Sequence, residues 1–176
     1  MKRILPLILS FGVLFGTPQV FFSPQDNLAD RLIELIQKEE KSIRIAIYFI
    51  TNRQIAKELI EAKKRGVHVE MICDPGTYKE KSAAQYLKEN GVLVSLFDPE
   101  KGAKYKKGKP IMHNKFAIFE RNSDQKPLLW TGSFNFTYAA TNKNKENALV
   151  IDDLDTIHFF EKEFDEIKTK YTAAPK

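Results

Sequence analysis

The chain has 176 residues, of which 43% are apolar and 29% charged, with 28 Lys and Arg against 23 Asp and Glu. This length suits one globular domain with a core of its own and excludes two full-sized domains. The single cysteine, Cys73, excludes an intramolecular disulfide, and its place in the apolar stretch "VEMICD" predicts a small buried side chain.

The N-terminus has the order of a secretory signal. Lys2 and Arg3 precede an apolar run over residues 4–15, and Gly16, Thr17 and Pro18 follow. A helix needs roughly 20 apolar residues to span a bilayer, and this run is shorter, although an uncleaved segment could still hold the protein at a membrane. We expect residues 1–19 to be a signal peptide or anchor, residues 20–176 to be the domain, and the protein to be exported, periplasmic or secreted.

From residue 20 the chain alternates strand-like and helix-like segments. We predict strands over 20–23, 42–50, 67–74 and 92–98, a helix capped by Asn27, a helix from Asn52 to Gly66, and a helix over 81–89. Strands separated by helices need crossover connections. The sequence therefore predicts an α/β protein with a mixed, mainly parallel sheet flanked by helices on both faces.

After Pro99 the pattern changes. A Lys-rich loop leads to three strand candidates, 111–120, 127–135 and 148–152, with no convincing helix between them. A final helix is predicted by an apolar stripe at helical spacing that should pack on the sheet: Leu154, Ile157, Phe160, Phe164, Ile167 and Tyr171. The acidic residues Asp152, Asp153 and Asp155 stand where capping of this helix explains them.

The stretch "MHNKFAIFE" at 112–120 places His113 and Lys115 two residues apart in a predicted strand, so both should point to one face. A single His-x-Lys is a weak motif, because an ordinary core histidine can precede a lysine by chance. In "TGSFNFT", Ser133 and Asn135 form a second pair with the same spacing, and Gly132 before them permits close backbone approach.

The carboxylate of Glu146 lies at the start of the third strand candidate and could orient an imidazole. Taken together, these residues can bring an imidazole, an ammonium, a hydroxyl, an amide and a carboxylate to one patch. Each has an ordinary structural explanation when it is considered alone, so their combination carries the functional prediction.

This combination resembles the catalytic motif of the phospholipase D superfamily, His-x-Lys-x4-Asp followed by Gly-Ser and Asn. From residue 20 onward the chain is similar to the small, single-motif bacterial endonucleases of that superfamily, the Nuc type. The similarity includes "FFSP", "IAIYFIT", "IAKELIEAKKRGV" and the strand that ends at Asp74. The resemblance implies the phospholipase D fold and a phosphodiesterase that needs no metal or other cofactor.

One position departs from the family pattern, because Glu120 stands where an Asp is usual. In the family this acid supports the fold and the site, so a longer carboxylate can be tolerated. Strand alternation also points Glu120 away from the face of His113 and Lys115.

The expected reaction follows from what a phosphodiester requires. His113 would attack phosphorus and form a phosphohistidine, while Glu146 holds the other ring nitrogen. Lys115 and Asn135 would donate to the phosphoryl oxygens, with Ser133 alongside them.

A second imidazole is needed to protonate the leaving group. His68 and His158 are the other histidines, and each is expected to be structural, the first inside a strand and the second on the terminal helix. We therefore expect a homodimer in which two copies of His113 and Lys115 share one active site.

The substrate is not decided by the motif. A lysine cluster before the catalytic strand matches a repeating phosphate backbone, and the aromatic rings of Tyr105 and Tyr138 could stack on unpaired bases. The expected nucleic-acid contacts are Lys101, Lys104, Tyr105, Lys106, Lys107 and Lys109. A nuclease is favoured, with single-stranded DNA first and RNA open. The alternatives are an exported phospholipase D acting on head groups, whose lysines would meet anionic membrane, and a DNA-binding domain without catalysis.

Overall fold

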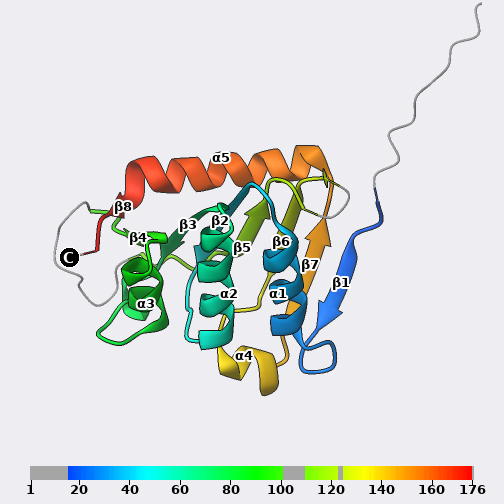
Figure 1. Cartoon of the computed structure of the whole chain (residues 1–176), viewed down its shortest axis with the longest axis horizontal. Coiled ribbons are helices and arrows are strands. Elements are labelled where there is room, and N and C mark those ends of the chain that lie inside the picture. Colours follow the sequence, from blue (N-terminus) through cyan, green and yellow to red (C-terminus); the bar gives the residue numbers. More distant parts are fainter. Residues whose placement is uncertain (1–15, 101–109, 123–124, 176) are drawn as a thin grey trace, which may run out of the picture.

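The computed structural model describes residues 16–100, 110–122 and 125–175, which build one eight-stranded sheet with helices on both faces (Figure 1). The strands are β1 (Gln19–Phe22), β2 (Ser42–Ile47), β3 (His68–Cys73), β4 (Leu93–Phe97), β5 (Lys115–Phe119), β6 (Leu128–Gly132), β7 (Asn147–Ile151) and β8 (Thr172–Ala173). The helices are α1 (Leu28–Lys38), α2 (Arg53–Lys64), α3 (Ala83–Glu89), α4 (Tyr138–Asn142) and α5 (Leu154–Tyr171), with a 3₁₀ turn η1 at Pro75–Thr77.

The strand order is β1-β7-β6-β5-β2-β3-β4-β8, and the expectation of a mainly parallel sheet is wrong. Among the paired strands, only β2 with β3 and β3 with β4 are parallel, and α2 and α3 make the crossovers between them. The other pairs, β1 with β7, β7 with β6, β6 with β5, β5 with β2 and β4 with β8, are antiparallel. The connections from β5 to β6 and from β6 to β7 each return the chain at the edge where the previous strand ended. These strands therefore alternate in direction.

The two faces of the sheet are covered unequally. Helices α1, α2 and α3 bury one face, where their apolar residues join those of the strands in the larger core cluster, and α1 and α2 lie side by side in Figure 1. On the opposite face α5 packs alone, through Ile157, Phe164 and Ile167. Leu154 from the predicted stripe is exposed, so the stripe begins to pack one turn later than expected. Cys73 is buried, as predicted, and loss of hydration raises the pKa of its thiol to about 12.

Several boundaries differ from the sequence-based expectation. The strand predicted over 111–120 begins only at Lys115. The backbone N–H of Met112 donates to the Asp74 carboxylate at 3.1 Å and is therefore not used for pairing with a neighbouring strand. The strand predicted over 127–135 ends at Gly132, and α4 follows it as an unexpected short helix. His113, Ser133 and Asn135 therefore stand on connections at the strand ends.

Side-chain caps were expected at the starts of α1 and α5, and the structure adds one at the start of α2. Asn52 caps α2, since its side-chain oxygen accepts from the N–H groups of Gln54 and Ile55, and Asp153 caps α5 through the N–H of Thr156. Asn27 stands at the N-cap position of α1, as predicted, but its side chain accepts no cap hydrogen bond, because its backbone is left-handed and its amide donates to Asp30.

The N-terminal signal predicted over residues 1–19 lies mostly outside the described residues, since only residues 16–19 of it are placed. None of the helices in the described parts of the chain is both long and apolar enough to cross a bilayer.

The residues of the motif follow or precede strands whose ends lie at one edge of the sheet. β2 and β6 finish there, and β5 and β7 start there, because Ile47 is paired with Lys115 and Gly132 with Ala148. Gly132 allows the close approach that was expected: its φ is 154°, and an added Cβ would lie 2.3 Å from the carbonyl oxygen of Asn147. This edge gathers all the residues of the predicted motif except Glu120.

A buried carboxylate supports the approach to this edge. Asp74 follows β3 and is 2% exposed; its Oδ1 accepts from the N–H of Gly76 at 2.8 Å, and its Oδ2 accepts from the N–H of Met112. Both carboxylate oxygens are therefore satisfied by backbone donors. The second bond holds the residue that immediately precedes His113.

We predict that Asp74→Asn lowers the free energy of unfolding by about 1–3 kcal/mol, because an amide offers one acceptor oxygen and turns an NH₂ group towards the other backbone N–H. Urea unfolding followed by the fluorescence of Trp130 measures the change. Glu163→Gln, at an exposed position in the middle of α5, is the control and should stay within about 0.5 kcal/mol of the wild type. An unchanged urea midpoint for Asp74→Asn would contradict the proposed support.

Candidate functional site

His113 and Lys115 are in contact at the start of β5. The Lys115 ammonium lies 3.2 Å from Nδ1 and 3.5 Å from Nε2 of the His113 ring, and it donates to the His113 carbonyl oxygen at 2.6 Å. The ammonium is nearly as close to one ring nitrogen as to the other, so it lies against the imidazole ring and is anchored by its bond to the carbonyl oxygen. The predicted proximity of the two side chains is therefore present, although His113 itself lies before the strand.

Tyr48, directly after β2, forms a wall of this pair. Its ring centroid is 4.7 Å from that of His113 at a tilt of 53°, and the Lys115 ammonium lies 5.6 Å from the Tyr48 centroid. The Tyr48 N–H donates to the carbonyl oxygen of Asn114 at 3.0 Å, which extends the β2–β5 pairing to the residue after His113. The tyrosine thereby restrains both the backbone and the ring of the His113 segment.

Partial burial weakens the hydration of the Lys115 ammonium. Loss of hydration lowers the pKa of its ammonium, and the negative charge of Glu146 partly offsets that effect. Glu146 is thus close enough to Lys115 to act on it electrostatically. A less hydrated cation donates more strongly to an anionic oxygen than one that is fully solvated.

Ser133 and Glu146 form the second contact of the site. The Ser133 hydroxyl donates to Oε2 of Glu146 at 2.6 Å, and the same hydroxyl oxygen accepts from the N–H of Asn147 at 3.0 Å. The other carboxylate oxygen, Oε1, accepts from the side-chain amide of Asn144 at 3.0 Å. Within one chain the carboxylate is therefore held by Ser133 and Asn144, and its predicted bond to His113 stays a prediction.

Asn135 is fixed by the chain next to Tyr48. Its side-chain oxygen accepts from the N–H of Phe49 at 3.2 Å, so the amide nitrogen is the end available to donate. The bond joins the segment after β6 to the segment after β2. The role of Asn135 as a donor to the phosphoryl oxygens stays a prediction.

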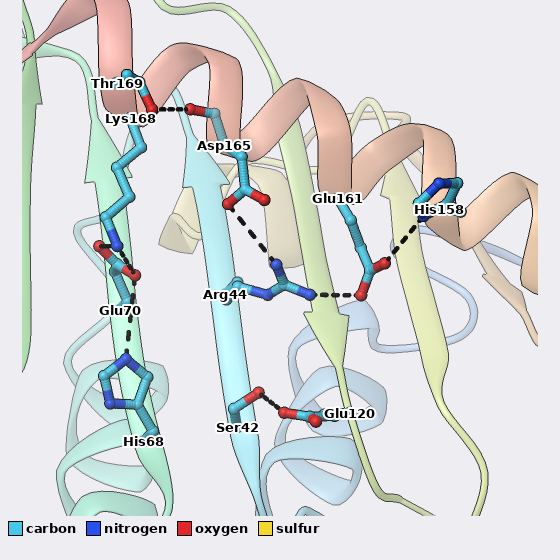
Figure 2. Close-up of polar contacts among 10 residues, drawn as sticks. All are labelled: Ser42, Arg44, His68, Glu70, Glu120, His158, Glu161, Asp165, Lys168 and Thr169. Carbon is cyan, nitrogen blue, oxygen red and sulfur yellow. Dashed lines mark hydrogen bonds and ion pairs between the residues drawn. The ribbon is translucent and has the colours of Figure 1, made fainter.

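Glu120 lies at the other end of β5, five residues from Lys115. It accepts from the Ser42 hydroxyl at 2.6 Å and from the ammonium of Lys41, and these bonds lower the pKa of its carboxyl group (Figure 2). Because of this position, the carboxylate ties β5 to the start of β2 and does not reach the site.

The other two histidines occupy the α5 side of the sheet. Figure 2 shows His68 beside Glu70, at 4.0 Å, and His158 beside Glu161, at 3.5 Å. His68 opens β3 at the edge opposite His113, and His158 lies in the early turns of α5. Among the described residues, only one imidazole therefore stands at the candidate site.

The predicted lysine loop, Lys101, Lys104, Tyr105, Lys106, Lys107 and Lys109, lies outside the described residues. Across 16–100, 110–122 and 125–175, no three or more His, Cys, Asp or Glu side chains gather in a way that could hold a metal ion. Activity without a metal stays a prediction.

Two open pockets adjoin the site. One, of about 440 Å³, lies between the His113 segment and α5 and includes Ile111 and Tyr171. The other, of about 570 Å³, lies beside Glu146 and includes Phe22 and Lys145. Both proposed reactive groups, His113 and Glu146, are thereby open to a ligand.

Sequence reasoning missed the residues that support the site. Tyr48 was placed inside a predicted buried strand, and Asp74 was noted only as the end of another strand. Ser23 bonds to the Glu146 segment from the far end of the chain. The only signal for these residues in the sequence was their position at or near the end of an apolar run, where a strand gives way to a turn.

The family and structural comparisons agree with this geometry. A family model described as "Cardiolipin synthase, PLD-like domain" matches residues 32–168. Nuc from Salmonella typhimurium, a phospholipase D family member, is 30% identical with a TM-score of 0.72, and the match covers 90% of this chain and 99% of that one. NucT from Helicobacter pylori is 29% identical with a TM-score of 0.74, over 89% and 98% of the two chains.

Curated relatives include lipid enzymes by name. A phospholipase D of Rickettsia typhi is 32% identical over 132 residues, which are 75% of this chain and 58% of that protein. A mitochondrial cardiolipin hydrolase of Xenopus tropicalis is 27% identical over 151 residues, 85% of this chain and 65% of that protein. The chain thus spans less than two thirds of the length of these relatives. The family match over most of the chain and the placement of its motif at one sheet edge establish that the protein belongs to the phospholipase D superfamily of phosphodiesterases, as a Nuc-type member.

Proposed function

We propose that the protein is a nuclease that hydrolyses DNA, with single strands preferred and RNA as a further substrate, at a site shared by two chains. The observation that carries this proposal is the match to Nuc and NucT over nearly the whole of those chains, because the lipid enzymes are matched over only part of their length. The sequence resemblance to single-motif endonucleases supports the same substrate.

The reaction proceeds in two displacements. A nitrogen of His113 attacks phosphorus, a bond forms between them, and the bond from phosphorus to the leaving oxygen breaks. Lys115 and the Asn135 amide donate to the phosphoryl oxygens, on which negative charge accumulates. His113 of the second chain gives its proton to the leaving oxygen. It then takes a proton from the water that attacks the phosphohistidine, and this step releases the nucleophile.

Exposed aromatic rings at this edge favour an unpaired nucleic acid. Phe22 is 55% exposed beside Glu146, and Tyr138 is 64% exposed at the start of α4, in a pocket with Asn52 and Arg53. Each ring could support one unpaired base, a contact worth about 1–3 kcal/mol. Hydrolysis of phospholipid head groups is the second candidate, because curated relatives carry the names of lipid enzymes. A DNA-binding protein without catalysis is the third.

The deciding assay compares nucleotide release from single- and double-stranded DNA and from RNA with head-group release from vesicles, all in excess chelator. We expect chelator-resistant hydrolysis of single-stranded DNA, and a loss of roughly a thousandfold or more in His113→Ala. Head-group release without nucleotide release would establish the phospholipase. Binding of DNA by an inactive wild-type protein would establish the third candidate, and activity restored only by magnesium would point to two-metal chemistry.

A shared site makes activity depend on pairs of intact chains. When wild-type and His113→Asn chains are refolded together in equal amounts, about one quarter of the dimers are fully wild type, so activity should fall to about one quarter. Independent sites would instead leave one half. Mixing His113→Asn with Lys115→Ala chains should restore nothing, and any recovery towards wild-type activity per site would exclude a site that needs both copies of both residues.

The pKa of Lys115 predicts the alkaline side of the pH profile. The reaction needs the ammonium form, and burial lowers the pKa of this group, so kcat/KM should decline at a pH below 10.5, the ordinary value for lysine. Steady-state rates on a short oligonucleotide measure this limb. The control variant Lys145→Gln removes an exposed lysine near Glu146 and should leave the limb in place. A decline only at or above pH 10.5 would contradict the assignment.

A further inference from the structure

Ser23 is a buried polar residue of the connection between β1 and α1, and it is 1% exposed. Its hydroxyl donates to the carbonyl oxygen of Asn144 at 2.8 Å and accepts from the N–H of Glu146 at 3.0 Å. Its own N–H donates to the carbonyl oxygen of Glu146 at 3.0 Å. One serine thus makes three hydrogen bonds to the segment that presents Glu146, across 123 positions of sequence.

The Glu146 segment has little packing of its own. Lys143, Asn144 and Lys145 are exposed, and Glu146 is the first residue in this stretch to be partly buried. The carboxylate is oriented by two donors, the Ser133 hydroxyl and the Asn144 amide. Since Ser23 holds the backbone of both Asn144 and Glu146, it restrains one of these donors and the carboxylate together.

We propose that Ser23 is a positioning residue for Glu146: it holds the main chain from which this carboxylate accepts from Ser133 and would orient an imidazole. This inference rests on the proposed phosphodiesterase activity of the site. Ser23 does not touch the substrate and moves no proton. It fixes the main chain on which the carboxylate stands, and a displacement of about 1 Å at such a group can lower a rate a hundredfold.

The test is Ser23→Ala in two backgrounds, with kcat and KM measured on an oligonucleotide and on bis(p-nitrophenyl) phosphate. We expect kcat to fall by roughly 10- to 100-fold in the wild-type background, with KM changed by less than about threefold. In the Glu146→Gln background the same substitution should change kcat by less than about twofold, because the group that it positions is already lost.

Ser42→Ala is the matched control. Ser42 is also a buried serine with a hydrogen-bonded hydroxyl, which donates to the carboxylate of Glu120 at 2.6 Å at the opposite edge of the sheet. Its loss should lower thermal stability without lowering kcat in either background. If Ser23→Ala does not fold, Ser23→Cys keeps the volume with weaker hydrogen bonds and should show a smaller fall in kcat with the same dependence on Glu146.

An equal fall in kcat in the two backgrounds would overturn the inference, as would a loss of stability with unchanged kcat. Neither result contradicts the proposed function, because the wild-type protein is an active phosphodiesterase in both cases. A wild-type protein that cleaves neither nucleic acids, phospholipids nor the chromogenic diester would overturn the proposed function itself, and with it the premise of this inference.

Discussion

The antiparallel pairing of β5 with β2 is the contact on which the candidate site depends. Its register places Lys115 beside Ile47, and the bond from Tyr48 to Asn114 continues it past the strand end. A slip by one residue would exchange the faces of Lys115 and Phe116, which would bury an ammonium on the α5 side. The apolar residues that fill both faces of β5 therefore hold the reactive lysine in place.

The polar contacts that stabilise the candidate edge of the sheet differ in kind from those on the face under α5. At the candidate edge, Asp74 and Ser23 bond to backbone groups, and Asn135 accepts from the backbone of Phe49. Under α5, charged side chains pair with each other, as Lys168 does with the buried Glu70 at 2.8 Å and Arg44 with Glu161 (Figure 2). Backbone donors and acceptors orient a group without adding a second charge beside it.

The proposed chemistry connects the geometry to a partner chain. Two imidazoles must act on opposite sides of one phosphorus atom, and the described residues bring only His113 to the edge. Twofold symmetry is the simplest source of the second, because it duplicates His113, Lys115 and the whole polar support at once. Glu146, which in one chain bonds to Ser133 and Asn144, stands in the same proposal as the carboxylate that would orient an imidazole.

The sequence by itself determined the elements and the motif. The apolar periodicity of 42–74 predicted β2, α2 and β3, and α2 begins directly after Asn52, where the helix was expected to start. The pair His113 and Lys115 was recognised from its spacing, together with Ser133 and Asn135. Local sequence carries this information because side chains i and i+2 share a strand face, and because helix starts need an acceptor for their free N–H groups.

Only the tertiary structure decided the directions of the strands, the ends of β5 and β6, and the residues that support the site. The prediction of a mainly parallel sheet failed because the direction of a strand depends on whether its connection crosses back to the end of the sheet where the previous strand began. The apolar pattern of a short strand is the same for both directions. Asp74 and Ser23 were missed for a related reason. Their partners, Met112 and Glu146, are 38 and 123 positions away, and such bonds exist only once the sheet has brought the ends of distant strands together.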